Sequence, residues 1–166
     1  MADHTFRVTF QQQLAMMIRM LIVYGVLLFI YFYYYGFGIE TPYQYIFLFF
    51  FLLDICPALL VHIQYLTINK GAALVINTEL KTINYTTRKE SFLYHFDDIE
   101  LLRHVASFGG GAWYSFSEYR YYRIVFKDKK EIVITCLMVK DIKNTLEMLL
   151  RMKAQKKLKV VAFVGH

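Results

Sequence analysis

Two long apolar runs near the start of the chain limit what it can fold into more than any other feature. They cover residues 14–35 and 43–65 of the 166 residues. Each is about as long as the ~20 residues that an α-helix needs to cross a bilayer core. Because only residues 36–42 separate them, we expect two antiparallel helices. The sequence therefore predicts a transmembrane hairpin within residues 1–66, followed by a separate domain over residues 67–166.

Charged residues give this hairpin an orientation. Arg7 and Arg19 lie at the start of the first run, Lys70 follows the second, and the connection carries Glu40 but no Lys or Arg. Since Lys and Arg are enriched on the cytoplasmic side of membrane proteins, we expect two spans with both termini in the cytoplasm.

The two parts of the chain also differ in charge. Residues 67–166 carry 17 Lys and Arg against 10 Asp and Glu, whereas residues 1–66 carry 2 against 3. A basic domain beside a membrane is attracted to anionic lipid by ~1 kcal/mol for each basic residue near the surface. Nucleic acid is not expected as a partner, because the sequence has no basic stripe with interleaved aromatic residues and no reader motif.

Asp54 is the one acidic residue inside an apolar run. An ionised carboxylate in the bilayer interior costs at least ~2.5–3.5 kcal/mol. Folding the hairpin about residues 39 and 40 puts Asp54 next to Tyr24, whose hydroxyl can donate to it, and opposite Gly25, which allows close approach. We therefore expect an Asp54–Tyr24 contact. We favour a structural clasp between the helices over a proton site or a docking point for another membrane protein.

The residues after the hairpin alternate between apolar and polar in short runs, which is typical of β-strands. A turn at residues 128–130 and a switch to helical spacing over residues 140–156 complete the pattern. The sequence predicts an α+β protein in which a curved antiparallel sheet is capped by a C-terminal helix. The expected strands cover residues 65–69, 74–76, 80–85, 90–96, 99–107, 119–127 and 131–137.

This arrangement resembles a known family. Two closely spaced spans precede Tyr65-Leu66-Thr67-Ile68, then Phe96-Asp97-Asp98-Ile99, a β-hairpin and an amphipathic helix. This order is similar to that of the bacterial membrane-anchored PH-like domain proteins. The resemblance implies a PH-like half-barrel on the cytoplasmic side of a bacterial inner membrane. Phosphoinositide-binding PH domains carry a basic cluster in their first hairpin, where this sequence offers only Lys70, so no specific inositide site is expected there.

A segment rich in aromatic and basic residues follows the three glycines at 109–111 and contains Trp113, the only tryptophan. Trp, Tyr and Arg supply much of the binding energy at interface hot spots. Two interpretations stay open for Trp113 and Phe116: a mobile loop that contacts lipid or a partner, or a plug inside the sheet. Including two lysines of the next turn, the expected binding residues are Trp113, Tyr119, Arg120, Arg123, Lys129 and Lys130.

No pattern in the sequence indicates catalysis or a cofactor. The five histidines are not spaced three or four apart, and neither Cys56 nor Cys136 has a close histidine, so no metal site is expected. The serines lie in no nucleophile-elbow pattern, and the glycines at 109–111 are not followed by Lys-Ser or Lys-Thr. The two cysteines are not expected to form a disulfide, which agrees with a reducing compartment.

The sequence therefore predicts a non-enzymatic, membrane-tethered binding or adaptor module. Its expected partners are membrane lipid and another protein, and self-association is an additional option. The alternative is a small membrane immunity or regulatory subunit that binds a toxin or a membrane complex through its hairpin. A membrane-bound enzyme is the third interpretation.

Overall fold

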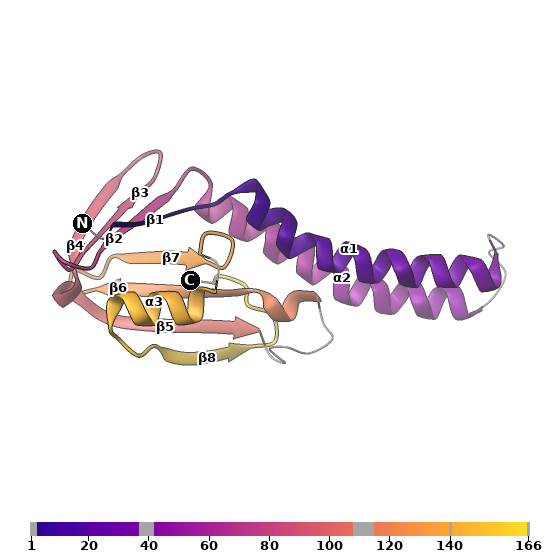
Figure 1. Ribbon diagram of the computed structural model, residues 1–166. Coiled ribbons are helices and arrows are strands. Elements are labelled where there is room, and N and C mark those ends of the chain that lie inside the picture. The colour runs from indigo at the N-terminus through magenta and orange to yellow at the C-terminus, as the bar shows by residue number, and fades with distance from the viewer. Residues whose placement is uncertain (1–2, 37–41, 108–114, 140, 166) are drawn as a thin grey trace.

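The computed structural model describes residues 3–36, 42–107, 115–139 and 141–165. A β-rich domain lies at one end, and two long antiparallel helices extend from it (Figure 1). These are α1 (Phe10–Tyr35) and α2 (Pro42–Asn69). Both are long and apolar enough to cross a membrane. The helical hairpin predicted from the sequence is therefore present as two helices.

The start of α1 has a capping box. The Thr9 hydroxyl accepts a hydrogen bond from the Gln12 backbone N–H, and the Gln12 side chain accepts one from the Thr9 N–H, both at 3.3 Å. These bonds satisfy two donors that a helix start otherwise leaves without partners. At the other end, Gly36 has φ 66°, a backbone conformation that favours glycine.

The strand expected over residues 65–69 is wrong, because these residues are the last turn of α2. Tyr65 and Asn69 are both fully buried. A spacing of four puts them on one face of a helix, and over five residues an apolar–polar alternation does not distinguish that face from a strand.

Eight strands form two four-stranded sheets within the described residues. The first sheet has the order β1-β2-β3-β4 and contains β1 (Asp3–Arg7), β2 (Ala73–Asn77), β3 (Thr82–Thr86) and β4 (Ser91–His95). The second has the order β7-β6-β5-β8 and contains β5 (Ile99–Ser107), β6 (Arg120–Phe126), β7 (Glu131–Thr135) and β8 (Gln155–Lys159). Strands β2 to β7 agree with the sequence-based prediction within a few residues.

The first strand precedes the hairpin in the chain. β1 pairs antiparallel with β2, so that Asp3 lies opposite Asn77 and Arg7 opposite Ala73. The hairpin is thus inserted between the first two strands of the domain, which corrects the expected division of the chain at residues 66 and 67. A five-residue strand at the chain start carries little periodicity of its own, and its partner is some 70 residues away.

The C-terminal helix is shorter than expected. α3 (Ile142–Leu150) ends at Arg151, which has φ 53°, and the chain then forms β8 parallel to β5. The predicted helix over residues 140–156 is therefore too long. The prediction of an antiparallel sheet is also partly wrong, because β8 runs parallel to β5 in the second sheet. Lysines near residue 156 suit the last turn of a helix, but they also suit an exposed edge strand.

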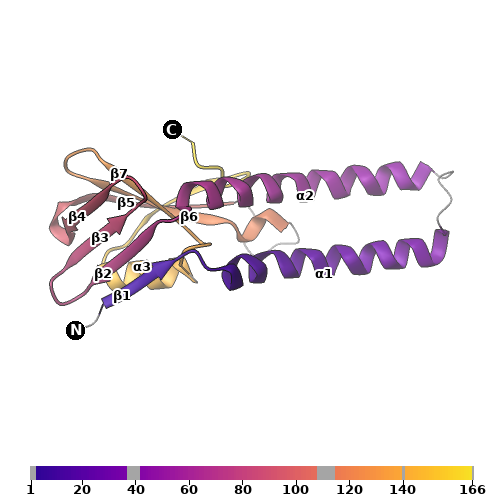
Figure 2. The same cartoon turned by 90° about the horizontal axis from the view of Figure 1, so that it is seen from above.

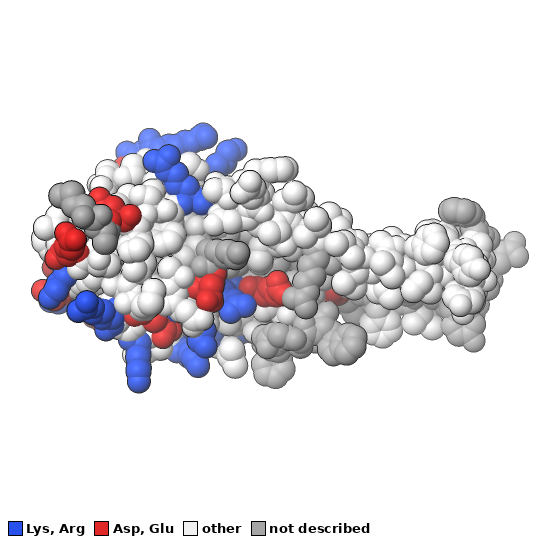
Figure 3. Space-filling model, in the orientation of Figure 1, with Lys and Arg blue, Asp and Glu red and all other residues white. Residues whose placement is uncertain are grey.

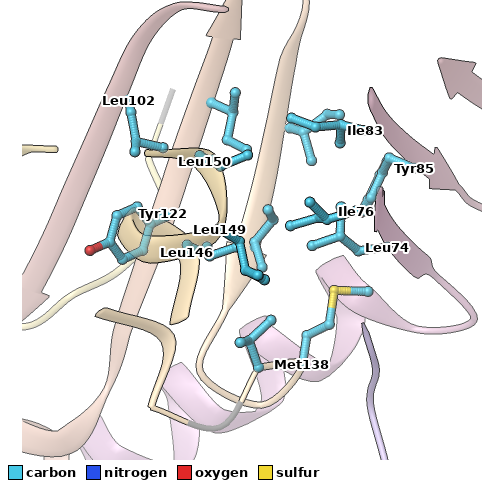
Figure 4. Packing of buried hydrophobic residues seen from close by; sticks show 14 of the residues in the cluster. Leu74, Ile76, Ile83, Tyr85, Leu102, Tyr122, Met138, Leu146, Leu149 and Leu150 are labelled. Carbon is cyan, nitrogen blue, oxygen red and sulfur yellow. The ribbon is translucent and has the colours of Figure 1, made fainter. Parts of the chain in front are cut away.

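Two clusters of buried side chains lie on opposite faces of the second sheet. In the first cluster, Leu146, Leu149 and Leu150 of α3 point between the sheets (Figure 4). There they meet residues such as Ile76 of β2 and Tyr122 of β6. In the second cluster, α2 packs on the other face of β5 and β6; its members are Ala58, Val61, Tyr65, Val105, Tyr119, Tyr121, Leu137 and Ala162.

Candidate functional site

The last turn of α2 is bound to the second sheet through Asn69, which is fully buried. Its Oδ1 accepts hydrogen bonds from the Thr135 hydroxyl at 2.6 Å and the Thr135 N–H at 3.2 Å. Its Nδ2 donates to the Val133 carbonyl at 3.0 Å. One side chain at the end of an apolar helix therefore satisfies several buried polar groups of β7.

The C-terminal tail strengthens this joint. The Tyr65 hydroxyl donates to the Ala162 carbonyl at 2.8 Å. The Gln64 side chain donates to the Val164 carbonyl at 2.8 Å and accepts from the Val164 N–H at 3.0 Å. Helix α2 is thus held between the sheet and the tail, so the hairpin and the domain form one packed unit.

Tyr119, one of the expected binding residues, belongs to this joint. Only 3% of its surface is exposed, and its hydroxyl lies 2.9 Å from Nδ1 of His62 on α2. Its ring also packs edge-on against Tyr65. The expectation of an exposed contact residue is therefore corrected: alternation along β6 identified the faces of the strand, but not that α2 covers one of them.

Asp54 connects the hairpin to the domain at a second point. Its carboxylate accepts hydrogen bonds from the Tyr24 hydroxyl, from the Ser115 N–H at 2.9 Å and from the Ser115 hydroxyl at 2.8 Å. Ser115 begins the short helix η2 (Ser115–Glu118), which contacts α2 and lies between the two hairpin helices in the view of Figure 2. The expected contact with Tyr24 is present.

The sequence did not identify Ser115 as the other partner of Asp54. Asp54 does not only join the two hairpin helices, because it also accepts hydrogen bonds from Ser115 of the domain. Ser115 follows the glycine-rich segment, and nothing in its local pattern separates it from the other serines of the chain.

The part of the hairpin beyond Asp54 stands clear of the described part of the domain (Figure 1). On α2 it runs from residue 42 to residue 53, which at 1.5 Å per residue is about 18 Å. Its side chains are apolar and open, for example Phe29 at 69%, Phe49 at 58% and Phe50 at 64% exposed. Figure 3 shows Lys, Arg, Asp and Glu gathered over the domain, whereas the described surface near the hairpin tip is uncharged.

The remaining expected binding residues do not form one surface. Arg123 is half-buried and pairs with Glu131 at 3.1 Å. Lys129 pairs with Glu100 at 2.8 Å. Lys130 lies over the Phe92 ring, 4.8 Å from its centroid.

These lysines follow β6 in a turn at the end of the domain away from the hairpin (Figure 1). Arg120 starts β6 near the hairpin instead, where it lines a small pocket. Trp113 lies outside the described residues.

His104 is a polar residue that sequence reasoning assigned to no site. It lies on β5, is 6% exposed, and stacks on Tyr122 with 4.8 Å between the ring centroids. Burial lowers the pKa of His104, as do the nearby cations Arg120, Lys143 and Lys156, while Glu147 opposes them. The imidazole is therefore neutral in the folded protein at pH 7.

This buried imidazole should make the folded state sensitive to acid. The pKa of His104 is lower in the folded than in the unfolded state. Above pH 6.5 the imidazole is neutral in both states and does not change the stability. As the pH falls below that value, the unfolded state binds a proton more readily than the folded state, so the free energy of unfolding decreases. We expect His104→Phe, which keeps a stacking ring, to lose less stability than the wild type between pH 7.5 and pH 5.5. Urea unfolding at each pH measures this difference, and parallel curves would contradict it.

The described residues offer binding geometry rather than reactive groups. The Cys136 residue is partly buried, and desolvation raises the pKa of its thiol to about 11, so it is not a nucleophile at neutral pH. Within the described ranges, no three His, Cys, Asp or Glu side chains are grouped so that they could hold a metal ion. The arrangement is suited to holding a domain in a set position on two apolar helices.

Comparison with known proteins agrees with this architecture. A family model described as PH domain matches residues 5–145, from β1 across both hairpin helices to the first turn of α3. No curated protein and no solved structure matches the chain. PH domains commonly bind proteins or lipids and are generally non-catalytic. Since the match covers most of the sequence, the chain belongs to the PH domain family.

Proposed function

We propose that this PH domain is a non-enzymatic binding module, held in a set orientation at the cytoplasmic face of a bacterial inner membrane by its hairpin. The observation that carries the proposal is the double role of α2. Its last turns belong to the buried core of the domain through Tyr65 and Asn69, while its first turns present open apolar side chains. A module that binds a partner or a lipid surface would be held in a constant position by such a hairpin, and its local concentration at the membrane would be higher.

The surface of the hairpin supports the membrane part of the proposal. Soluble monomers rarely expose apolar patches larger than a few hundred Å², and both hairpin helices are apolar on their outer faces. Tyr33, Tyr34 and Tyr35 end α1 with 56–75% of their surfaces exposed. Tyrosines are favoured at membrane–water interfaces, so a crossing hairpin would place them at the outer boundary.

The junction at Asp54 sets how deep the domain would sit. About 18 Å of helix beyond Asp54 is shorter than the ~30 Å of a bilayer core. With residue 42 at the outer boundary, Asp54 would lie about 12 Å short of the inner boundary of the core. The domain end that carries η2 would therefore enter the inner leaflet, where the Tyr24 and Ser115 donors would satisfy the Asp54 side chain.

Cysteine labelling tests the orientation. In a chain carrying Cys56→Ala and Cys136→Ala, a single cysteine is introduced as Thr41→Cys between the helices or as Lys129→Cys in the domain. We expect a membrane-impermeant maleimide to label Thr41→Cys in intact cells, and Lys129→Cys only after lysis. Labelling of Lys129→Cys from outside would overturn the topology, and the cysteine-free chain reports background.

Photo-crosslinking tests the binding role and its rival. A crosslinker replaces Lys130 at the far end of the domain in one chain, and Phe49 on the outer face of α2 in another. An adaptor should give protein adducts from position 130 and lipid adducts from position 49. Protein adducts from position 49 alone would instead favour an immunity or regulatory subunit that acts through its hairpin.

A further inference from the structure

A pocket of about 340 Å³ lies between β5, β8, η2 and the first turn of α3. β5 and β8 run parallel, with His104 opposite Lys156 and Ala106 opposite Leu158, and both strands end on the side of the domain that faces the hairpin (Figure 1). Since η2 also contacts α2, the pocket is near the base of the hairpin.

Four cations line this pocket. Arg120 comes from β6, Lys143 from α3, and Lys156 and Lys157 from β8. Lys157 pairs with Val105, whose side chain lies on the other face of the sheet, so only the first three side chains lie on the side of His104. One carboxylate, Glu147, is close enough to act on His104. It accepts a hydrogen bond from the Tyr122 hydroxyl at 2.7 Å and is not among the residues that line the pocket.

His104 supplies a second, independent sign of a ligand. Its Nε2 atom is shut off from solvent and has no hydrogen-bond partner among the described residues, although the side chain lines the pocket. A buried polar group without a partner costs about 1–3 kcal/mol, and native proteins rarely leave one in that state. An acceptor bound in the pocket would remove this cost once the side chains that cover Nε2 move aside, because the atom is closed to solvent without a ligand.

We propose that this pocket binds a phosphate monoester, with Nε2 of His104 as the innermost donor and Arg120, Lys143 and Lys156 around the phosphate oxygens. A monoester carries a charge of about −1.5 to −2 and three acceptor oxygens, which suits several converging cations better than a single carboxylate does. The site lies on the second sheet, away from the turn between β2 and β3 on the first. It is therefore separate from the first β-hairpin of the domain, where phosphoinositide-binding PH domains carry a basic cluster and this sequence offers only Lys70.

The ester could be the headgroup of a lipid or a small soluble molecule. A lipid source rests on the membrane anchor proposed above, because only then does the inner leaflet lie beside the pocket; a soluble source does not. Both sources share the same chemistry, so glycerol 3-phosphate and phosphatidic acid serve as the two probes.

Calorimetry on the full chain separates the sources. Glycerol 3-phosphate is titrated into protein held in nanodiscs of phosphatidylcholine, of phosphatidylcholine with phosphatidic acid, or of phosphatidylcholine with phosphatidylserine. Binding that phosphatidic acid blocks and phosphatidylserine does not assigns a lipid headgroup to the pocket. Binding that neither lipid blocks assigns a soluble ester. If no glycerol 3-phosphate binds to protein in plain phosphatidylcholine, the proposal is overturned, whatever the labelling experiment shows about the anchor.

Paired variants separate the pocket from overall charge. Lys143→Gln with Lys156→Gln should weaken binding at least tenfold. Lys127→Gln with Lys153→Gln removes the same charge from exposed positions outside the pocket and should weaken it less than threefold. Equal losses in the two pairs would show that only net charge matters, and would overturn the site.

His104→Phe tests the innermost donor. It keeps a ring on Tyr122 and removes the unpartnered nitrogen, so the melting temperature without ligand should be unchanged or higher. Binding of glycerol 3-phosphate should nevertheless weaken about tenfold. Unchanged affinity in this variant would contradict the role given to His104.

Discussion

Replacing Asn69 by alanine is expected to lower the free energy of unfolding by about 3–5 kcal/mol. The substitution removes the partner of the Thr135 N–H, the Thr135 hydroxyl and the Val133 carbonyl, all at the buried joint between α2 and β7. Each buried polar group that loses its partner costs about 1–3 kcal/mol, and no water can reach a residue that is fully buried. This is a large part of the 5–15 kcal/mol by which domains are stable.

Urea unfolding of the full chain in detergent micelles, followed by near-UV circular dichroism, measures this loss. Asn84→Ala is the matched control: Asn84 lies on β3 and accepts hydrogen bonds only from the exposed Thr86 and Ser91 hydroxyls among the bonds described for it. We expect that control to cost about 0.5 kcal/mol or less. A loss below about 1 kcal/mol for Asn69→Ala would mean that Asn69 does not join the helix to the sheet.

The second large effect is expected at Asp54. Asp54→Leu removes the acceptor for the Tyr24 hydroxyl and for both donors of Ser115, so η2 should separate from the hairpin. We expect the free energy of this local opening to fall by about 2–4 kcal/mol, because three hydrogen bonds are lost, each contributes about 0.5–1.5 kcal/mol, and the freed donors can then meet water. Asp54→Asn keeps one carbonyl acceptor and should show a smaller loss.

Amide hydrogen exchange at residues 115–118 measures the opening, since exchange in a native protein reports local as well as global unfolding. Leu53→Ala is the control: Leu53 is the neighbouring residue, is 53% exposed, and should leave exchange in η2 unchanged. If Asp54→Leu leaves this exchange as slow as in the wild type, the contact with Ser115 does not hold the domain to the hairpin.

The fold shows which kinds of signal a sequence carries well. Strands β2 to β7 and the helices were predictable because each has a local period, such as Phe92, Tyr94 and Phe96 on one side of β4 and its extension. The length of the connection was also sufficient to place Asp54 next to Tyr24 across the hairpin. In each case the evidence lay within one element or between two neighbouring ones.

The errors have the opposite character. β1 and β8 are five-residue strands whose partners are far away in the chain, and residues 65–69 have an alternation that fits a strand and a helix equally well. Tyr119 was assigned to a surface because a strand pattern gives its faces but not what covers them. The pocket at His104 combines residues from five separate elements, none of which has a motif of its own.

By itself, the sequence determined that the chain has two apolar helices and a basic, β-rich domain, since apolar length, period and charge are local properties of the chain. Only the tertiary structure decided that the hairpin is inserted within the domain and packed into its core. It alone also shows that Asp54 accepts hydrogen bonds from Ser115 and that Arg120, Lys143 and Lys156 lie near His104. Contacts such as these join residues that are 50 to 70 positions apart, and their free energy depends on burial that no single segment encodes.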